Sequence, residues 1–181
     1  MLQNRQQSYG WISITLHWLM GFMVIGMFLL GVWMTSLDYY SPWYHDAPEL
    51  HKSIGVLLFF LLLFRWVWRI TQVRPVLMGK LWEQQIALLV HRMHYLLLFV
   101  IVITGYLIPT AEGVGIELFH LFTLPATFTF SKTEADWIGS IHHYSAWASM
   151  GLVTMHAAAA LKHHFVDKDH TLLRMLGMSQ K

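Results

Sequence analysis

The stretch HHYSAWASMGLVTMHAAAAL, residues 142–161, decides the fold. It contains no acidic or basic residue other than histidine, and it is long enough to cross a bilayer as a helix. Its histidines His142 and His156 are fourteen positions apart, which places them within roughly 40° of each other on one helix face and about 21 Å apart along the axis. Two imidazoles on one face at two membrane depths favour two stacked metal centres. The alternative is a pair of buried polar residues that bond to neighbouring helices.

The whole chain has the composition of a membrane protein. Its 181 residues are 56% hydrophobic and only 12% charged, which is too apolar for a soluble domain of this size. Four apolar stretches predict membrane-spanning helices at residues 11–34, 50–68, 88–108 and 139–161. The first stretch is too long for a cleavable signal and lacks a small-residue cleavage site, so we interpret it as a retained signal anchor. We therefore expect an all-α integral membrane four-helix bundle that forms one domain over residues 1–181.

Lysine and arginine are strongly sorted between the two sides of these spans. Ten of the twelve lie in the N-terminal segment, around the second loop or in the C-terminal tail. By the positive-inside rule both termini are cytoplasmic, in a bacterial inner membrane. The outer side carries only Lys52 and Lys132 against seven acidic residues, which are Asp38, Asp46, Glu49, Glu112, Glu117, Glu134 and Asp136. The outer surface is therefore predicted to be acidic.

Two segments outside the spans also carry predictions. The connection between the third and fourth spans, residues 109–137, is half apolar, and we expect it to lie along the membrane surface and to cover a pocket there. The tail after the fourth span reads as a turn and a short interfacial helix, which Asp169 or Thr171 could cap.

Membrane depth sorts four histidines into two pairs. His17 and His156 are each about six residues from the cytoplasmic end of their spans, so they share one level. His51 and His142 open the second and fourth spans at the outer face, so they share the other level. Each pair is drawn from two different helices.

The residue one helical turn after each of these histidines is small. These residues are Gly21, Gly55, Ala146 and Ala160, whereas His143, His91 and His94 are followed by larger side chains. A flat macrocycle beside a helix needs such space, because positions i and i+4 lie on the same face. Ordinary close packing of membrane helices would also use small residues. The chain has no cysteine, which excludes thiolate sites, and no third ligand is evident at either depth, so haem suits the pairs better than zinc.

Basic residues near each level could pair with haem propionates. Lys52 is the predicted partner at the outer level, and Arg65, Arg69 or Arg92 at the inner level. Control of membrane topology explains each of these residues equally well.

The motifs HWL at residues 17–19, LHKSIG at 50–55, MHAAAALKHHF at 155–165 and KDHTLLRM at 168–175 resemble the bacterial cytochrome b561 family. The resemblance covers nearly the whole chain. It implies a four-helix membrane cytochrome with two b-type haems, which exchanges electrons with the ubiquinone pool. Carried over by position, it implies that His17 and His156 bind the inner haem iron, and that His51 and His142 bind the outer one.

One branch of this family oxidises superoxide with ubiquinone as acceptor, and the present sequence departs from that branch in one place. The branch has a basic first outer loop, whereas residues 36–49 here contain no lysine or arginine. An acidic outer face repels an anion such as superoxide rather than steering it inwards. Superoxide oxidation therefore stays an alternative to simple exchange of electrons with quinone.

The sequence allows alternatives for the quinone site and for the partners. An outer site would be lined by His51, Lys52, His120 and loop aromatics such as Trp43 and Tyr44. An inner site would use His91, Arg92 and His94, which also suit structural or propionate contacts. The chain could instead be the membrane-anchor cytochrome subunit of a basic periplasmic redox protein, or a histidine-lined transporter without haem. We expect lipid and quinone as partners, and no nucleic acid.

Overall fold

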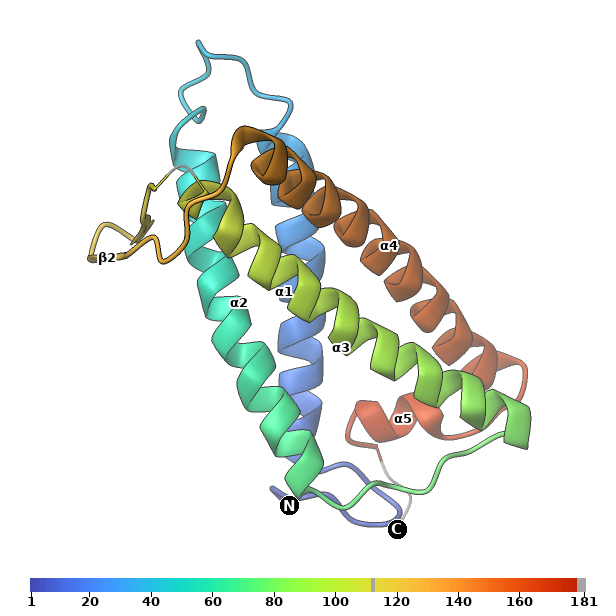
Figure 1. Cartoon of the computed structure of the whole chain (residues 1–181). Coiled ribbons are helices and arrows are strands. Elements are labelled where there is room, and N and C mark those ends of the chain that lie inside the picture. The colour runs from blue at the N-terminus through green and yellow to red at the C-terminus, as the bar shows by residue number, and fades with distance from the viewer. Residues whose placement is uncertain (112, 179–181) are drawn as a thin grey trace.

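The computed structural model describes residues 1–111 and 113–178 and is mostly helical (Figure 1). Its helices are α1 (Trp11–Met34), α2 (Asp46–Thr71), α3 (Leu81–Thr110), α4 (Lys132–Phe165) and the short α5 (Thr171–Met175). Two strands, β1 (Ile116–Leu118) and β2 (Phe122–Leu124), lie between α3 and α4. Glu112, counted among the acidic residues of the outer side, lies outside the described residues. Lys181, counted among the basic residues of the C-terminal tail, lies outside them as well.

Three of these helices, α1, α2 and α3, are long and apolar enough to cross a membrane. Helix α4 is the longest, at 34 residues, but its composition is less apolar because histidine, serine, threonine and tyrosine interrupt it. The chain is thus a mostly helical protein with three helices able to span a membrane and a fourth long helix beside them.

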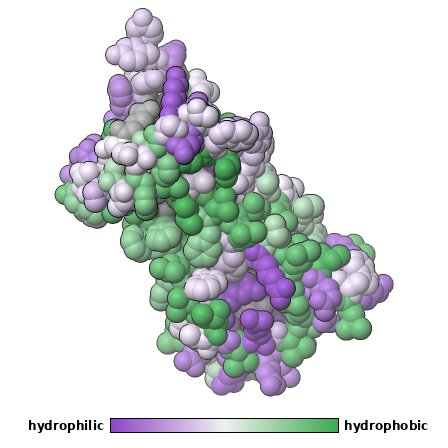
Figure 2. Space-filling view, in the orientation of Figure 1, coloured by the Kyte–Doolittle hydropathy of each residue, from purple (hydrophilic) through white to green (hydrophobic). Residues whose placement is uncertain are grey.

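The long helices pack as neighbours in chain order. Helix α1 packs against α2, α2 against α3, and α3 against α4. Met20, Leu58 and Leu62 form a buried cluster between α1 and α2, and Tyr95 and Phe99 of α3 pack on it. In the face shown in Figure 2, hydrophobic side chains cover the middle of the molecule and hydrophilic ones gather towards its ends. Such a belt suits a lipid environment.

Three helices begin earlier than the predicted spans, since α2 begins at Asp46, α3 at Leu81 and α4 at Lys132. Helix α2 begins at Asp46, because Pro48 is tolerated in a first turn and the carboxylates of Asp46 and Glu49 favour a helix N-terminus. Helix α4 begins at Lys132, after a capping box in which Ser131 and Glu134 satisfy each other's backbone N–H groups.

Strands β1 and β2 form an antiparallel hairpin, with Leu118 paired with Phe122. Phe119 and His120 in its turn have positive φ angles of 49° and 58°, which is uncommon for residues other than glycine. The hairpin is fastened to α2 by Ser53, whose hydroxyl donates to the carbonyl of Glu117 at 3.2 Å and accepts from the N–H of Phe119 at 3.1 Å. Ser53 is fully buried, so this anchor is shielded from water.

The N-terminal segment, the loop after α2 and helix α5 meet at the opposite end of the molecule (Figure 1). The indole N–H of Trp18 donates to the carbonyl of Met175 at 2.8 Å, and the guanidinium of Arg174 donates to that of Val76 at 2.8 Å. The carboxylate of Asp169, one of the two predicted caps, accepts from the N–H of Thr171 at 2.8 Å and so satisfies one N–H of the first turn of α5. The N-cap position itself is His170, whose side chain makes no capping hydrogen bond.

Candidate haem and redox site

The structure brings the outer histidines together from two helices. The rings of His51 on α2 and His142 on α4 have centroids 6.3 Å apart at an interplanar angle of 74°. Both side chains are half-buried. The pairing of these residues, which depth along the spans predicts, therefore corresponds to a close approach of their imidazoles.

The inner histidines approach in the same way. His17 on α1 and His156 on α4 have ring centroids 6.0 Å apart at an angle of 62°. Helix α4 thus supplies one histidine to each pair, while α1 and α2 supply the partners.

Both separations fit a metal ion held between two imidazoles. Metal–nitrogen bonds of about 2 Å on opposite sides of an ion put the two ring centroids about 6 Å apart, once the distance from nitrogen to ring centre is added. The observed values of 6.0 Å and 6.3 Å agree with this arrangement. Two facing imidazoles would be able to hold the iron of a b-type haem, so the residues present fit that group.

The hydrogen bonds of His142 leave the correct nitrogen free for a metal. Its Nδ1 lies 2.9 Å from the carbonyl oxygen of Ile101, which can only accept, so Nδ1 carries the ring proton. Nε2 is then the unprotonated nitrogen. A backbone carbonyl that fixes the tautomer and orientation of a ligating histidine is a common feature of metal sites.

The inner pair has a different hydrogen-bond pattern. Arg65 lies 3.3 Å from Nδ1 of His17, and it also donates to the hydroxyl of Tyr95 at 3.1 Å. Because a guanidinium can only donate, Nδ1 of His17 is the acceptor in this contact and the ring proton sits on Nε2. Ligation of iron through Nε2 therefore requires Arg65 to turn to another acceptor. A haem propionate, the partner predicted for Arg65, is one such group.

Two glycines that sequence reasoning missed lie directly against the outer rings. A Cβ atom on Gly105 of α3 would stand 3.1 Å from Cε1 of His142, and one on Gly31 of α1 would stand 3.3 Å from Cε1 of His51. The small residues chosen from the sequence lie elsewhere, since Gly21 has no atom within 4 Å of its Cβ position and Gly55 meets only Met27 at 3.7 Å. No sequence pattern marks Gly31 and Gly105, because they act across helices rather than along one.

His91 and His94 of α3 also surround His156. Their ring centroids lie 5.6 Å and 5.4 Å from that of His156, and Nε2 of His94 is buried with no hydrogen-bond partner among the described residues. Four imidazoles from three helices therefore gather at the inner level. From the sequence, the two on α3 are candidates for an inner quinone site and also suit structural or propionate contacts.

Lys52, the predicted propionate partner at the outer level, forms an ion pair in the structure. Its ammonium lies 2.5 Å from a carboxylate oxygen of Glu49, one turn earlier on α2. Lys52 would have to leave Glu49 to meet a propionate. At the inner level Arg69 lies over the ring of Tyr95, 5.1 Å from its centroid, and so remains close to the histidine cluster.

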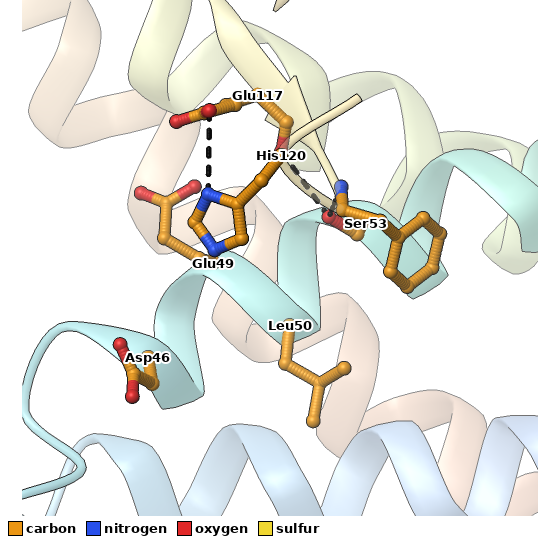
Figure 3. Close-up of a pocket in the computed structure, with 7 residues that line it drawn as sticks. Asp46, Glu49, Leu50, Ser53, Glu117 and His120 are labelled. Carbon is orange, nitrogen blue, oxygen red and sulfur yellow. Dashed lines mark hydrogen bonds and ion pairs between the residues drawn. The ribbon is translucent and has the colours of Figure 1, made fainter. Parts of the chain in front are cut away.

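A cavity of about 200 Å³ lies at the outer end of α2, beneath the hairpin (Figure 3). It is lined by Asp46, Glu49, Leu50, Ser53, Glu117, Phe119 and His120. Of the residues predicted for an outer quinone site, only His120 lines it. Trp43 instead packs near Trp33, and Tyr44 near Tyr39.

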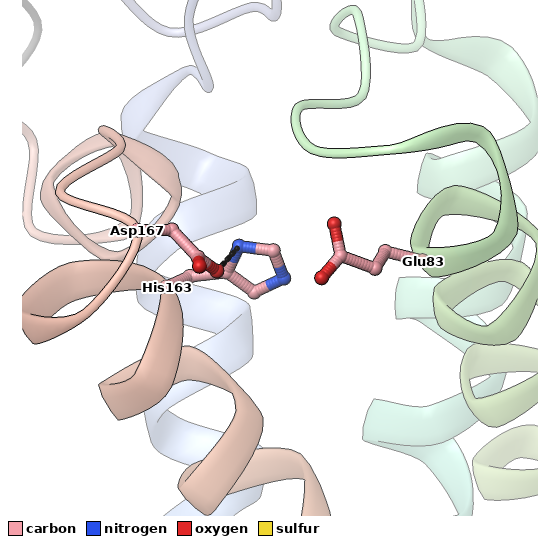
Figure 4. Close-up of side chains that lie close together, drawn as sticks. All are labelled: Glu83, His163 and Asp167. Atoms are coloured by element: carbon pink, nitrogen blue, oxygen red, sulfur yellow. Dashed lines mark ion pairs between the residues drawn. The ribbon is translucent and has the colours of Figure 1, made fainter.

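Near the inner ends of α3 and α4, Glu83, His163 and Asp167 place ligand-type atoms within 4.8 Å of one another (Figure 4). The ammonium of Lys162 already bridges the two carboxylates, at 2.6 Å from Glu83 and 2.8 Å from Asp167. Asp169 adds a further contact to Nδ1 of His163 at 2.7 Å. We interpret this group as an ion-pair network that fastens α3 to the end of α4, because a lysine occupies the place of a cation.

Taken together, the apolar helices and two facing pairs of histidines define the class as a membrane protein with imidazole pairs that could hold a metal group. Comparison with known proteins leads to the same class. The sequence profile described as prokaryotic cytochrome b561 matches residues 8–178, and the chain belongs to this family. Membership implies a membrane-embedded electron-transport protein of oxidoreductase type that carries b-type haem.

Curated relatives match over most of their length. The chain is 48% identical to cytochrome b561 homolog 2 of Escherichia coli (strain K12), over 97% of this chain and 95% of the relative. It is 30% identical to a protein of Yersinia pestis named probable superoxide oxidase CybB, over 94% and 96% of the two chains. It is 29% identical to cytochrome b561 homolog 1 of E. coli, over 75% and 78%.

Proposed function

We propose that the chain is a four-span, di-haem cytochrome that exchanges electrons with the ubiquinone pool of the bacterial inner membrane. The observation that carries this proposal is the presence of two imidazole pairs, at 6.0 Å and 6.3 Å, on a chain of the cytochrome b561 family. The proposal treats residues 1–181 as one transmembrane domain, with α4 as the fourth span.

In this proposal His17 and His156 hold the inner haem, and His51 and His142 hold the outer one. The bound haems supply one-electron redox chemistry. The chain's own residues orient the ligands and fill the space around them. The carbonyl of Ile101 fixes the ring of His142, and Arg65 supplies positive charge at the inner level. Lys52 is the proposed propionate partner at the outer level.

The proposed orientation puts both termini in the cytoplasm. The N-terminal segment, the loop after α2 and helix α5 lie at one end of the molecule, and they carry basic residues including Arg5, Arg74 and Arg174. The hairpin and the first turn of α2 lie at the other end, where acidic residues predominate. The distribution supports a cytoplasmic location for the first end under the positive-inside rule.

Superoxide oxidation is the second candidate, and the relative named as a probable superoxide oxidase is the observation that favours it. Against it stands the acidic outer end, where Lys52 is already paired with Glu49. A negative surface lowers the local concentration of an anionic substrate. A third candidate, a membrane-anchor subunit, is favoured by the same acidic surface, which suits a basic periplasmic redox protein.

The first experiment is to purify the protein, count its haems by the pyridine haemochrome method, and mix the oxidised form with ubiquinol or superoxide by stopped flow. We expect two haems per chain and haem reduction by ubiquinol. One haem or none would contradict the proposed ligation. Rapid reduction by superoxide, undiminished at low salt, would favour the second candidate. Two haems that neither substrate reduces would favour the anchor subunit.

A further inference from the structure

The two helices that carry the inner histidine pair make few direct contacts with each other. Helix α1, with His17, packs chiefly on α2, and α4, with His156, packs chiefly on α3. The 6.0 Å separation of the two rings therefore depends on other elements that join these helices. An element that fixes this pair has to hold α1 against rotation, because the rotation of a helix about its axis decides where each side chain points.

The C-terminal segment, residues 168–178, joins the end of α4 to α1, and we call it the clasp (Figure 1). At α4, the carboxylate of Asp169 lies 2.7 Å from Nδ1 of His163 and accepts from the N–H of Thr171 at 2.8 Å. The N–H of Asp169 also donates to the carbonyl of His163 at 3.0 Å. The clasp is thereby fixed to the last turn of α4 before it crosses to α1.

Two tryptophans of α1 contact the other end of the clasp. The indole N–H of Trp18 donates to the carbonyl of Met175 at 2.8 Å. The backbone at Gly177 lies directly against the ring of Trp11, since a Cβ atom there would stand 2.9 Å from Cη2 of that ring. Trp11 and Trp18 are seven positions apart and so share one face of α1. A helix that is held at two points of one face cannot turn about its axis without breaking these contacts.

Trp18 is also the immediate neighbour of the proposed ligand His17. The two rings have centroids 5.5 Å apart at an interplanar angle of 82°. The guanidinium of Arg174 adds a bond from the clasp to the carbonyl of Val76, in the loop after α2, at 2.8 Å. The clasp thus meets α1 beside one ligand of the inner pair, and it begins on the helix that supplies the other.

We propose that the clasp sets the geometry of the inner histidine pair, and that Trp18 is the positioning residue through which it acts on His17. The clasp ties α4 to α1 and holds α1 in the rotation at which His17 faces His156. The outer pair lies towards the hairpin end of the molecule and is independent of the clasp. The inference rests on the proposed ligation of the inner haem, and it gives a role to two motifs, at residues 17–19 and 168–175.

Two substitutions test the clasp at its two contacts with α1. Gly177→Ala places a methyl group against the ring of Trp11, and alanine is also strained at the positive φ angle of 76° found there. This substitution leaves the surroundings of His17 untouched. Trp18→Phe removes the indole N–H that binds the clasp but keeps an aromatic ring beside His17.

Each substitution has a matched control at the outer end of the molecule. Gly113→Ala puts alanine at a φ angle of 77°, but Gly113 has no atom within 4 Å of its Cβ position. Trp137→Phe removes an indole N–H from a side chain that is 68% exposed and makes no hydrogen bond to the described residues. Both controls should behave as the unchanged protein does.

The first measurement is the rate at which each haem passes from the loaded protein to an excess of apomyoglobin. The inner haem is identified as the one that the His156→Ala variant lacks. We expect it to leave the Trp18→Phe variant about three- to ten-fold faster, the effect of one lost hydrogen bond. It should leave the Gly177→Ala variant at least as fast, because backbone strain adds to steric overlap. The outer haem should keep its rate in both.

Two further measurements separate positioning from general stability. The EPR g values of the oxidised inner haem depend on the relative orientation of its two imidazole planes, and they should shift in these two variants alone. Hydrogen–deuterium exchange of the peptide over residues 171–178 should be faster in the same two variants, in haem-free protein as well.

Four results would overturn the inference. Faster exchange of the clasp with unchanged loss of the inner haem would show that the clasp does not position the ligands, and two haems per chain would then leave the proposed function standing. Unchanged exchange would show that the contacts of Trp18 and Gly177 do not hold the clasp. Equal acceleration for both haems would identify a general loss of stability instead. An unchanged protein that carries no inner haem would refute the proposed function and this inference together.

Discussion

Replacing Gly105 with alanine puts a methyl group against the ring of His142, 3.1 Å from Cε1 and 3.4 Å from Nδ1. Carbon atoms in good contact are about 3.5 to 4.0 Å apart, so the ring or helix α3 must move by about 0.4 to 0.9 Å. The ring has little freedom to move, because Nδ1 is held by the carbonyl of Ile101 at 2.9 Å. Overpacking of this kind costs about 1 to 3 kcal/mol.

If His142 binds the outer haem, displacement of its ring weakens the bond between the ring and the iron. We expect the Gly105→Ala variant to bind the outer haem about 5- to 150-fold more weakly, the range that corresponds to about 1 to 3 kcal/mol. Gly31→Ala should act in the same direction but less strongly, because its methyl would stand 3.3 Å from Cε1 of His51. Gly151→Ala is the matched control, since Gly151 is exposed on α4 and has no atom within 4 Å of its Cβ position.

The assay is the rate at which each variant loses haem to an excess of apomyoglobin, followed by its absorbance, together with the number of haems that remain. One haem should leave faster from the Gly105→Ala variant, while the other leaves at the unchanged rate. Two haems lost at the rates of the unchanged protein would refute the reasoning, because His142 would then not be constrained by Gly105 or would not be a ligand.

Three further predictions test other parts of the structure. His156→Ala should remove the inner haem and spare most of the outer one in spectra of the folded protein; equal loss of both would contradict separate pairing. Gly55→Leu should expel the outer haem by steric overlap, so full haem content by pyridine haemochrome would contradict the use of small residues along α2. Burial acts to raise the pKa of Asp169, but hydrogen bonds from Thr171 and His163 outweigh it and hold that pKa below its usual 3.8. A depressed carboxyl pKa stabilises the folded state above 3.8, so Asp169→Asn should lower the thermal midpoint at neutral pH, and the difference should vanish as the pH falls through the depressed pKa; a difference that persists at lower pH would contradict this.

The helices were the most predictable part of the fold, because long apolar runs are a strong signal in sequence. Helix α1 has the same bounds, Trp11–Met34, as the first predicted span. Hydrophobicity marks where a helix enters lipid rather than where its hydrogen bonds begin, so α2, α3 and α4 extend beyond the predicted spans. Their true starts depend on local features, such as the capping box at Ser131.

The hairpin was not predicted, and its turn explains why. Phe119 and His120 occupy positive φ angles, where sequence rules expect glycine or asparagine. The conformation is held by the distant hydroxyl of Ser53, sixty-six positions from Phe119. A turn that depends on tertiary contacts leaves no local signature.

The candidate site was also predictable only in part. The pairing of four histidines followed from depth and helix periodicity, and the structure places each pair at close range, although ligation itself stays a prediction. The contacts that refine the site join different helices, as with Gly105 against His142 and His94 against His156. One sequence without a structure could not reveal them, because they depend on how the helices rotate about their axes.

The spacing of His142 and His156 along α4 has an electrical consequence. Fourteen residues of helix separate the two levels by about 21 Å, roughly two-thirds of the hydrocarbon thickness of a bilayer. Under the proposed ligation, an electron that moves between the levels carries its charge across most of the membrane field. That work is about 1.5 kcal/mol for each 100 mV of potential, which is about a ten-fold change in the equilibrium between the two haems. The membrane voltage would therefore help to decide which end of the protein holds the electron.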